Sequence, residues 1–176
     1  MSVFISVVTY CDPVLPFTLR RAVERARWPE RLHFAVIDQS SAGSPGPDDA
    51  NVAPARLSLV TIDPLQARGP CWARSLAMSL YAGEDWFFQI DSHMDFDPHW
   101  DERLITQALD LQTRQRGIVI SSYPNAFDLE NGEPVRKAAT DKVLAHVVKG
   151  GSQFAPGHPV LSFEAHPFDS ETPVRG

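Results

Sequence analysis

An aspartate and a histidine stand two positions apart in the stretch Gln89-Ile90-Asp91-Ser92-His93-Met94. In an extended chain, positions i and i+2 point to the same side, so the side chains of Asp91 and His93 are expected to reach one ion. Mn²⁺ and similar divalent ions accept such a mixture of ligands, and a metal ion there could neutralise a diphosphate leaving group. The alternative is that Asp91 caps a turn and His93 is a surface residue. Asp95 and Asp97 either continue the alternation or cap the next helix.

A second candidate site is the Arg68-Gly69-Pro70 step, which precedes a predicted helix. The exposed N–H groups of a helix N-terminus favour phosphate, and Arg68 and Arg74 would add charge-assisted donors. The alternative is an ordinary loop-to-helix junction with solvated arginines.

A third candidate is the turn Thr9-Tyr10-Cys11-Asp12-Pro13, which follows the first predicted strand. An aspartate or backbone group there could bind the edge of a base or a ribose. The alternative is simple turn chemistry, because Asp-Pro commonly starts a turn. Asp38-Gln39 ends the second predicted strand and could line the same crevice.

The elements that position these residues follow from hydrophobic periodicity. The pattern predicts strands at 3–9, 32–38, 57–62, 86–90 and 118–122, helices at 16–27, 71–81 and 101–114, and one more strand near 142–149. Strands that alternate with helices indicate a mostly parallel sheet flanked by helices, in the α/β class. In such sheets ligands bind at the carboxyl ends of the strands, where all three candidates lie.

Composition excludes several classes of protein. The chain has 176 residues and a formal net charge of −6, so we expect no nucleic-acid partner and no anionic-membrane binding. It has no apolar run long enough for a membrane span and no basic region before its first apolar run, so a cytoplasmic location is expected. The two cysteines cannot form a disulfide framework. GxGxxG, P-loop, GxSxG and HExxH motifs are absent.

Together, the motifs resemble those of the polypeptide N-acetylglucosaminyltransferase family, which includes enzymes that add GlcNAc to hydroxyproline. The resemblance covers roughly residues 3–122. It rests on three strings: Ile5-Ser6-Val7-Val8-Thr9-Tyr10 with Asp12-Pro13, Ala67-Arg68-Gly69-Pro70 with Ala73-Arg74, and Gln89-Ile90-Asp91-Ser92-His93-Met94 with Phe96 and Trp100-Asp101. A similar Asp-X-His occurs in polypeptide GalNAc-transferases.

The resemblance implies a GT-A-like fold, a UDP-sugar donor such as UDP-GlcNAc, Mn²⁺ or Mg²⁺, and retention of configuration at the transferred sugar. It makes Asp91 and His93 the metal ligands and a protein or peptide hydroxyl the acceptor. The residues it implies at the donor site, together with Gln39 from the crevice argument, are Thr9, Tyr10, Asp12, Gln39, Arg68, Arg74 and Asp91.

Two departures from the family pattern bear on the function. Cys11 stands where the family usually has an arginine, and no Gly-Glu-Glu motif follows residue 122. We therefore expect one GT-A-like domain over residues 1–176, with a nucleotide-sugar-binding half at 1–122, an irregular, partial acceptor side at 123–176 and an incomplete C-terminal region.

Three functional hypotheses follow. The first is a metal-dependent transferase that moves GlcNAc from UDP-GlcNAc to a protein hydroxyl, with activity of this short form in question. The second is a non-catalytic nucleotide-sugar-binding module or a degraded glycosyltransferase. The third, a metal-dependent phosphoesterase, is disfavoured because no second cluster of ligands is visible in the sequence. No catalytic base can be named.

Overall fold

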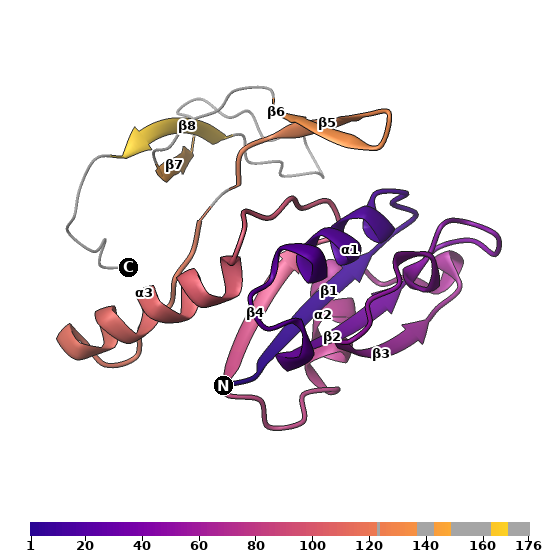
Figure 1. Ribbon diagram of the computed structural model, residues 1–176. Helices are drawn as coiled ribbons and strands as arrows, with labels where there is room; N and C mark the ends of the chain where they lie inside the picture. The colour runs from indigo at the N-terminus through magenta and orange to yellow at the C-terminus, as the bar shows by residue number, and fades with distance from the viewer. Residues whose placement is uncertain (123, 137–142, 149–162, 169–176) are drawn as a thin grey trace. The chain divides into compact units, whose positions relative to one another are not determined.

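The computed structural model describes residues 1–122, 124–136, 143–148 and 163–168 (Figure 1). The chain divides into two compact units, Met1–Arg116 and Gly117–Gly176, which are described separately.

The first unit is built on a four-stranded sheet in the order β3-β2-β1-β4. Every neighbouring pair in this sheet is parallel. This arrangement confirms the predicted α/β class and each of the four N-terminal strands. The elements of the unit are β1 (Val3–Thr9), α1 (Leu15–Arg25), β2 (Leu32–Asp38), β3 (Arg56–Thr61), α2 (Pro70–Met78), β4 (Trp86–Asp91) and α3 (Trp100–Arg114), with short 3₁₀ turns at Pro29–Arg31, Pro47–Ala50 and Pro64–Gln66.

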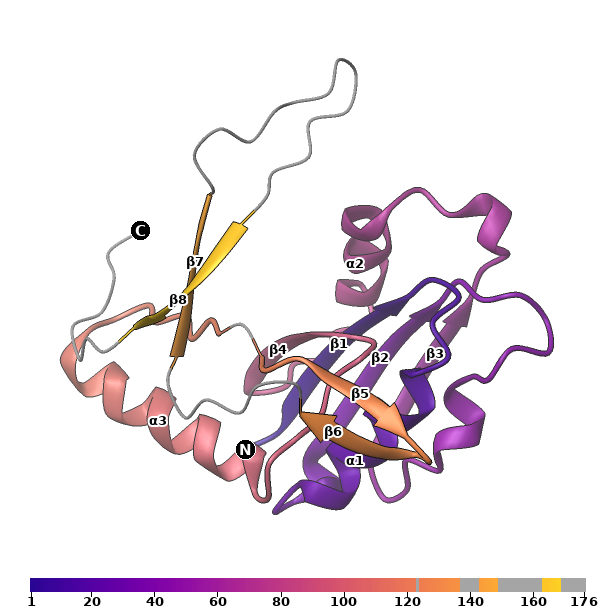
Figure 2. The ribbon, with the colours of Figure 1, turned by 90° about the horizontal axis from the view of Figure 1, so that it is seen from above.

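Helices cover both faces of this sheet. Side chains of α1 and α3 pack with those of β1 and β2 in the larger core cluster, where Leu19, Trp100 and Phe34 are all buried. α2 lies across the opposite face, where Ala73 and Ala77 pack with Ile37. Figure 2 shows α1 and α2 on opposite sides of the strands. Because both faces are covered, β1 and β2 are almost continuously apolar, as expected for buried parallel strands.

The junction before α2 depends on glycine. Gly69 has a φ of +87° and immediately precedes Pro70, the first residue of the helix. A positive φ is readily adopted only by glycine, and proline fits the first helical position because the N–H that it lacks would have no helical partner there. The Gly-Pro step therefore sets the point at which α2 begins.

α3 is anchored to the C-terminal end of α1 by one buried carboxylate. Asp101 is 2% exposed. Its two oxygens accept hydrogen bonds from the backbone N–H groups of Arg27 (2.7 Å) and Trp28 (3.0 Å). The carboxylate also lies in the first turn of α3, where negative charge is favourable.

Within its described residues, the second unit contains two antiparallel pairs of strands. One is the hairpin of β5 (Phe127–Glu130) and β6 (Glu133–Arg136), and the other joins β7 (Val143–Val148) to β8 (Phe163–Phe168). β7 confirms the strand predicted near 142–149. The strand predicted at 118–122 is wrong, since this segment has no regular structure. None of the helices in the described residues is long and apolar enough to span a bilayer.

Candidate functional site

The candidate site lies where β1 and β4 end side by side. Val8 pairs with Asp91 in the parallel register, so the segments that follow the two strands leave the sheet at the same edge. β1 is joined to β2 on one side and pairs with β4 on the other. A crevice between neighbouring strands whose connections run in opposite directions is the usual ligand site of an open α/β sheet.

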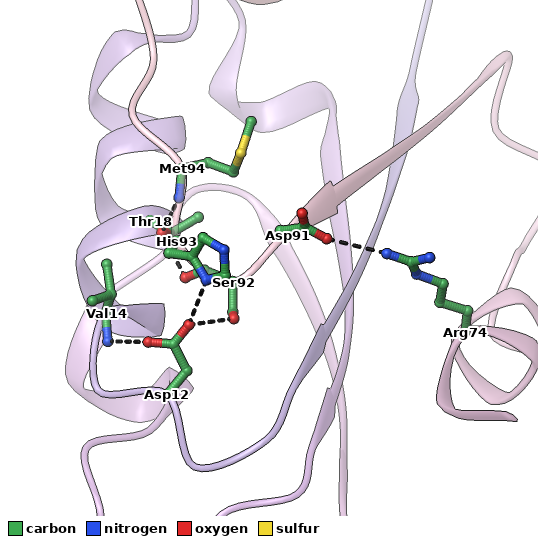
Figure 3. Close-up of polar contacts among 8 residues, drawn as sticks. All are labelled: Asp12, Val14, Thr18, Arg74, Asp91, Ser92, His93 and Met94. Carbon is green, nitrogen blue, oxygen red and sulfur yellow. Dashed lines mark hydrogen bonds and ion pairs between the residues drawn. The ribbon is translucent and has the colours of Figure 1, made fainter. Parts of the chain in front are cut away.

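The carboxylate of Asp12 links these two segments (Figure 3). Its Oδ2 accepts hydrogen bonds from Ser92 Oγ (2.6 Å) and His93 Nδ1 (2.8 Å), and its Oδ1 accepts one from the backbone N–H of Val14 (2.9 Å). Burial alone would raise the pKa of Asp12, but the hydrogen bonds from Ser92, His93 and Val14 outweigh it and hold the pKa below its ordinary value. Asp12 is therefore an ionised acceptor at neutral pH.

Thr18 fixes the backbone of the segment that carries His93. Its side chain is fully buried on α1. The hydroxyl donates to the carbonyl of Ser92 (2.7 Å) and accepts from the N–H of Met94 (2.9 Å). One side chain thus satisfies the backbone groups on both sides of His93.

Asp91 forms the other half of the site. Its Oδ1 accepts a hydrogen bond from Nη2 of Arg74 at 3.1 Å, across to α2 (Figure 3). The Nε of Arg74 is buried and has no hydrogen-bond partner within the described part of the chain. A guanidinium with an unused donor beside a carboxylate at a pocket wall is suited to binding an anion.

These groups surround a pocket of about 540 Å³. Six of the predicted site residues line it, namely Thr9, Tyr10, Gln39, Arg74, Asp91 and His93, together with Val8, Pro64, Ala67, Gly69, Pro70 and Ser92. Two predicted donor-site residues do not. Asp12 lies against His93, and the guanidinium carbon of Arg68 lies 5.6 Å from the ring centroid of Trp72.

The pocket wall also contains buried polar atoms that have no hydrogen-bond partner among the described residues. The Oγ1 of Thr9 and the Oε1 of Gln39 are buried and make no hydrogen bond to the described residues. The amide nitrogen of Gln39 donates to the Thr9 carbonyl at 3.0 Å, so that side chain is held in place with its oxygen unused. Buried polar atoms are normally paired, and these two lie at the pocket that a ligand would enter.

The alternation assumed from sequence ends at Asp91, the last residue of β4. Beyond it the chain bends, and the side chains of Ser92 and His93 both reach the same oxygen of Asp12. Asp91 and His93 nevertheless line the same pocket. Among the residues that the structure describes, no three His, Cys, Asp or Glu side chains group together as metal ligands.

The other acidic candidates lie in ion pairs. Asp95 accepts from Nε of Arg21 at 3.1 Å, and Asp97 lies 3.9 Å from Nη1 of Arg103. Sequence reasoning did not assign roles to Ser92 and Thr18. No motif marks Thr18, since only the fold brings α1 against the end of β4.

A larger and more acidic cavity of about 850 Å³ lies at the carboxyl ends of β2 and β3. Its lining includes four aspartates, Asp38, Asp48, Asp49 and Asp63, and shares Pro64 with the smaller pocket.

Comparison with known proteins identifies the family to which the chain belongs. No curated protein matches the chain. Among solved structures, TarS of S. aureus (residues 1–349) is similar over 73% of this chain and 42% of that one, with 16% identity and a TM-score of 0.49. This chain thus spans less than half the length of that protein's chain. A family model described as Glycosyltransferase (GlcNAc) matches residues 49–152. Since this match includes more than half of the 176 residues, the chain belongs to the GlcNAc glycosyltransferase family.

Proposed function

We propose that this protein transfers GlcNAc from UDP-GlcNAc to a hydroxyl group of a protein or peptide acceptor, with retention of configuration, and that it uses Mn²⁺ or Mg²⁺. The observation that carries the proposal is one pocket lined by Arg74, Asp91 and His93 in a chain of the GlcNAc glycosyltransferase family. The hydroxyproline-type acceptor and the UDP donor come from the sequence resemblance.

The site offers separate groups for the nucleoside and for the diphosphate of a nucleotide-sugar. On the nucleoside side, the buried oxygens of Thr9 and Gln39 can accept hydrogen bonds from a base or ribose. The exposed ring of Tyr10 can stack on a base. On the diphosphate side, Arg74 presents a guanidinium at the pocket wall. Arg68 does not line the pocket but stands just before the N-terminus of α2, where anions are favoured. The size of the pocket, about 540 Å³, suits part of such a ligand.

The residues present also fit a divalent ion. Asp91 and His93 supply one carboxylate and one imidazole at the same pocket, a donor set that Mn²⁺ accepts. When bound, the ion would neutralise charge on the diphosphate of the donor. Arg74 already pairs with Asp91 at 3.1 Å, so it is placed to add positive charge where UDP departs.

Calorimetric titration of UDP-GlcNAc, with and without MnCl₂, tests this proposal. We expect Mn²⁺-dependent binding by the wild type and a loss of more than about tenfold in affinity, or about 1.4 kcal/mol, in Asp91→Ala. Asp110→Asn is the matched control, because Asp110 is an exposed carboxylate on α3 that forms an ion pair with Arg114 at 3.2 Å. Equal affinity of wild type and Asp91→Ala would refute the assignment of Asp91.

A second measurement separates transfer from binding alone. Release of UDP and a gain of one GlcNAc on a hydroxyproline-containing peptide, followed by mass spectrometry, would support the transferase. Mn²⁺-dependent binding of UDP-GlcNAc without release of UDP would instead identify a non-catalytic nucleotide-sugar-binding module.

A further inference from the structure

We propose that Asp12 is a positioning residue that holds His93 as its Nδ1–H tautomer, so that the lone pair of Nε2 is presented to the pocket. The hydrogen bonds around Asp12 carry this inference, and its consequence for a metal ion rests on the function proposed above. Asp12 itself does not line the pocket.

The first step concerns the direction of the hydrogen bond. Asp12 Oδ2 lies 2.8 Å from His93 Nδ1, and an ionised carboxylate can only accept. Nδ1 must therefore carry the proton. In a neutral imidazole the other nitrogen, Nε2, then has the lone pair.

The second step concerns orientation. The side chain of Asp12 is 18% exposed, whereas that of His93 is 63% exposed. The ring therefore contacts Asp12 on one edge, while most of the side chain remains exposed to solvent. His93 is also one of the residues that line the pocket. In Figure 3 the Nδ1 of His93 faces Asp12, and the second ring nitrogen lies on the side away from that carboxylate.

The third step concerns rigidity. Asp12 is held by the N–H of Val14 at 2.9 Å and by the hydroxyl of Ser92 at 2.6 Å. The backbone on both sides of His93 is fixed by Thr18. A carboxylate with so few alternative positions can select one ring orientation. Carboxylates that accept from the second nitrogen of a ligating histidine act in this way in metal sites generally.

Long-range ¹H–¹⁵N NMR of the whole chain tests the proposal without metal or substrate. The spectra are recorded at mildly alkaline pH, where imidazole rings are neutral, and the signals of His93 are assigned with His93→Gln. We expect the Nδ1–H form in the wild type and in the control Asp110→Asn, which changes an exposed carboxylate on α3. Asp12→Ala should shift His93 towards the Nε2–H form.

Asp12→Asn guards against a folding failure of the alanine variant, because the amide keeps the shape of the side chain and can still accept from Val14. Its NH₂ group can donate to Nδ1, so a shift towards the Nε2–H form is expected here too. If His93 keeps the Nδ1–H tautomer in every folded Asp12 variant, the proposal is overturned.

Mn²⁺ titration of the same variants, without nucleotide, measures the consequence for the metal site. We expect the affinity for Mn²⁺ to fall about 10- to 100-fold in Asp12→Ala and to change little in Asp110→Asn, whose carboxylate is exposed on α3. Undetectable Mn²⁺ binding in the wild type would count against the proposed metal centre, while the tautomer would still decide the role of Asp12. A switched tautomer with unchanged Mn²⁺ affinity would show that His93 Nε2 is not a ligand, which overturns the link from Asp12 to the metal.

Discussion

Replacing Thr18 with valine tests whether α1 holds the site in place. Valine has nearly the shape of threonine but has no hydroxyl, so the carbonyl of Ser92 and the N–H of Met94 lose their partner. Thr18 is fully buried, which leaves no direct route for water to replace the lost hydrogen bonds of 2.7 and 2.9 Å. The substitution thus removes two hydrogen bonds while adding no cavity.

The magnitude follows from these two contacts. A buried polar group that loses its partner costs about 1–3 kcal/mol. Two such groups are left here, so Thr18→Val should lower the free energy of unfolding by about 2–6 kcal/mol. Thr18→Ser is the matched control. It keeps the hydroxyl and loses one methyl group. Since burying one CH₂ group contributes about 0.8 kcal/mol, this substitution should lower the free energy of unfolding by about that amount. Against a total stability of about 5–15 kcal/mol, the difference between these variants is measurable.

Urea unfolding followed by tryptophan fluorescence provides the assay, because the chain contains four tryptophans. The midpoint should fall for Thr18→Val with little change in the denaturant slope, which would identify a change in stability alone. We also expect Thr18→Val, and not Thr18→Ser, to weaken binding of UDP-GlcNAc. Surface substitutions that disturb no specific interaction usually change the free energy of unfolding by less than about 0.5 kcal/mol. If the free energies of unfolding of the two variants differ by no more than this, the role assigned to the hydroxyl is refuted.

Two further predictions concern carboxylates, that of the buried Asp101 and that of the partly buried Glu84. Asp101→Asn should lower the free energy of unfolding by about 1.5–3 kcal/mol, because the amide replaces one of the two oxygens that accept charge-assisted backbone hydrogen bonds. Chemical denaturation measures this loss. An equal loss in the exposed Asp110→Asn would contradict the prediction. Burial tends to raise the pKa of Glu84, but hydrogen bonds from the Ala82 N–H and from His33 hold it below its ordinary value. Its contribution to stability is therefore present above the ordinary glutamate range and lost as the pH falls through the lowered pKa. The free energy of unfolding, measured at a series of pH values, should fall with decreasing pH in the wild type and fall less in Glu84→Gln. Parallel plots of this free energy against pH for the two proteins would contradict the role assigned to Glu84.

Much of the first unit could be predicted from the sequence because its signals are local. Runs such as Val3–Thr9 and Leu32–Asp38 are almost continuously apolar, and both form central strands of the sheet. The Gly69-Pro70 step likewise marks the start of α2. Each of these features is determined within a few residues.

The errors arise where the outcome depends on distant partners. The segment 118–122 is β-branched and apolar, yet it forms no strand, and Val119 is 86% exposed. A β-strand forms only where a neighbouring strand pairs with it, and a high β-propensity of the residues does not provide that neighbour. The hairpin of β5 and β6 is not among the predicted elements, although Asn131-Gly132 is a typical hairpin turn. Both residues have positive φ, +55° and +83°, as the two-residue turn favoured by Asn-Gly requires.

In the candidate site, too, local features could be predicted from the sequence and contacts between distant residues could not. The residue types at Arg74, Asp91 and His93 could be selected from motifs, and all three line one pocket. The contact of Asp12 with His93 could not be predicted, because it depends on the pairing of β1 with β4 and on the bend after Asp91. A sequence pattern identifies the polar groups at strand ends but does not determine which of them meet.

The carboxylate of Asp12 meets a hydroxyl that lies 80 positions further along the chain. Contacts between such distant positions form only after much of the chain has become ordered, because closing long loops costs entropy. The pocket should therefore be absent from any peptide that contains only one of the two segments. By mass action, a ligand that binds only the folded pocket stabilises the whole first unit, by about 2.7 kcal/mol at 100 times its Kd. Thermal unfolding is thus a way to screen nucleotide-sugars and metal ions against this chain before any acceptor is known.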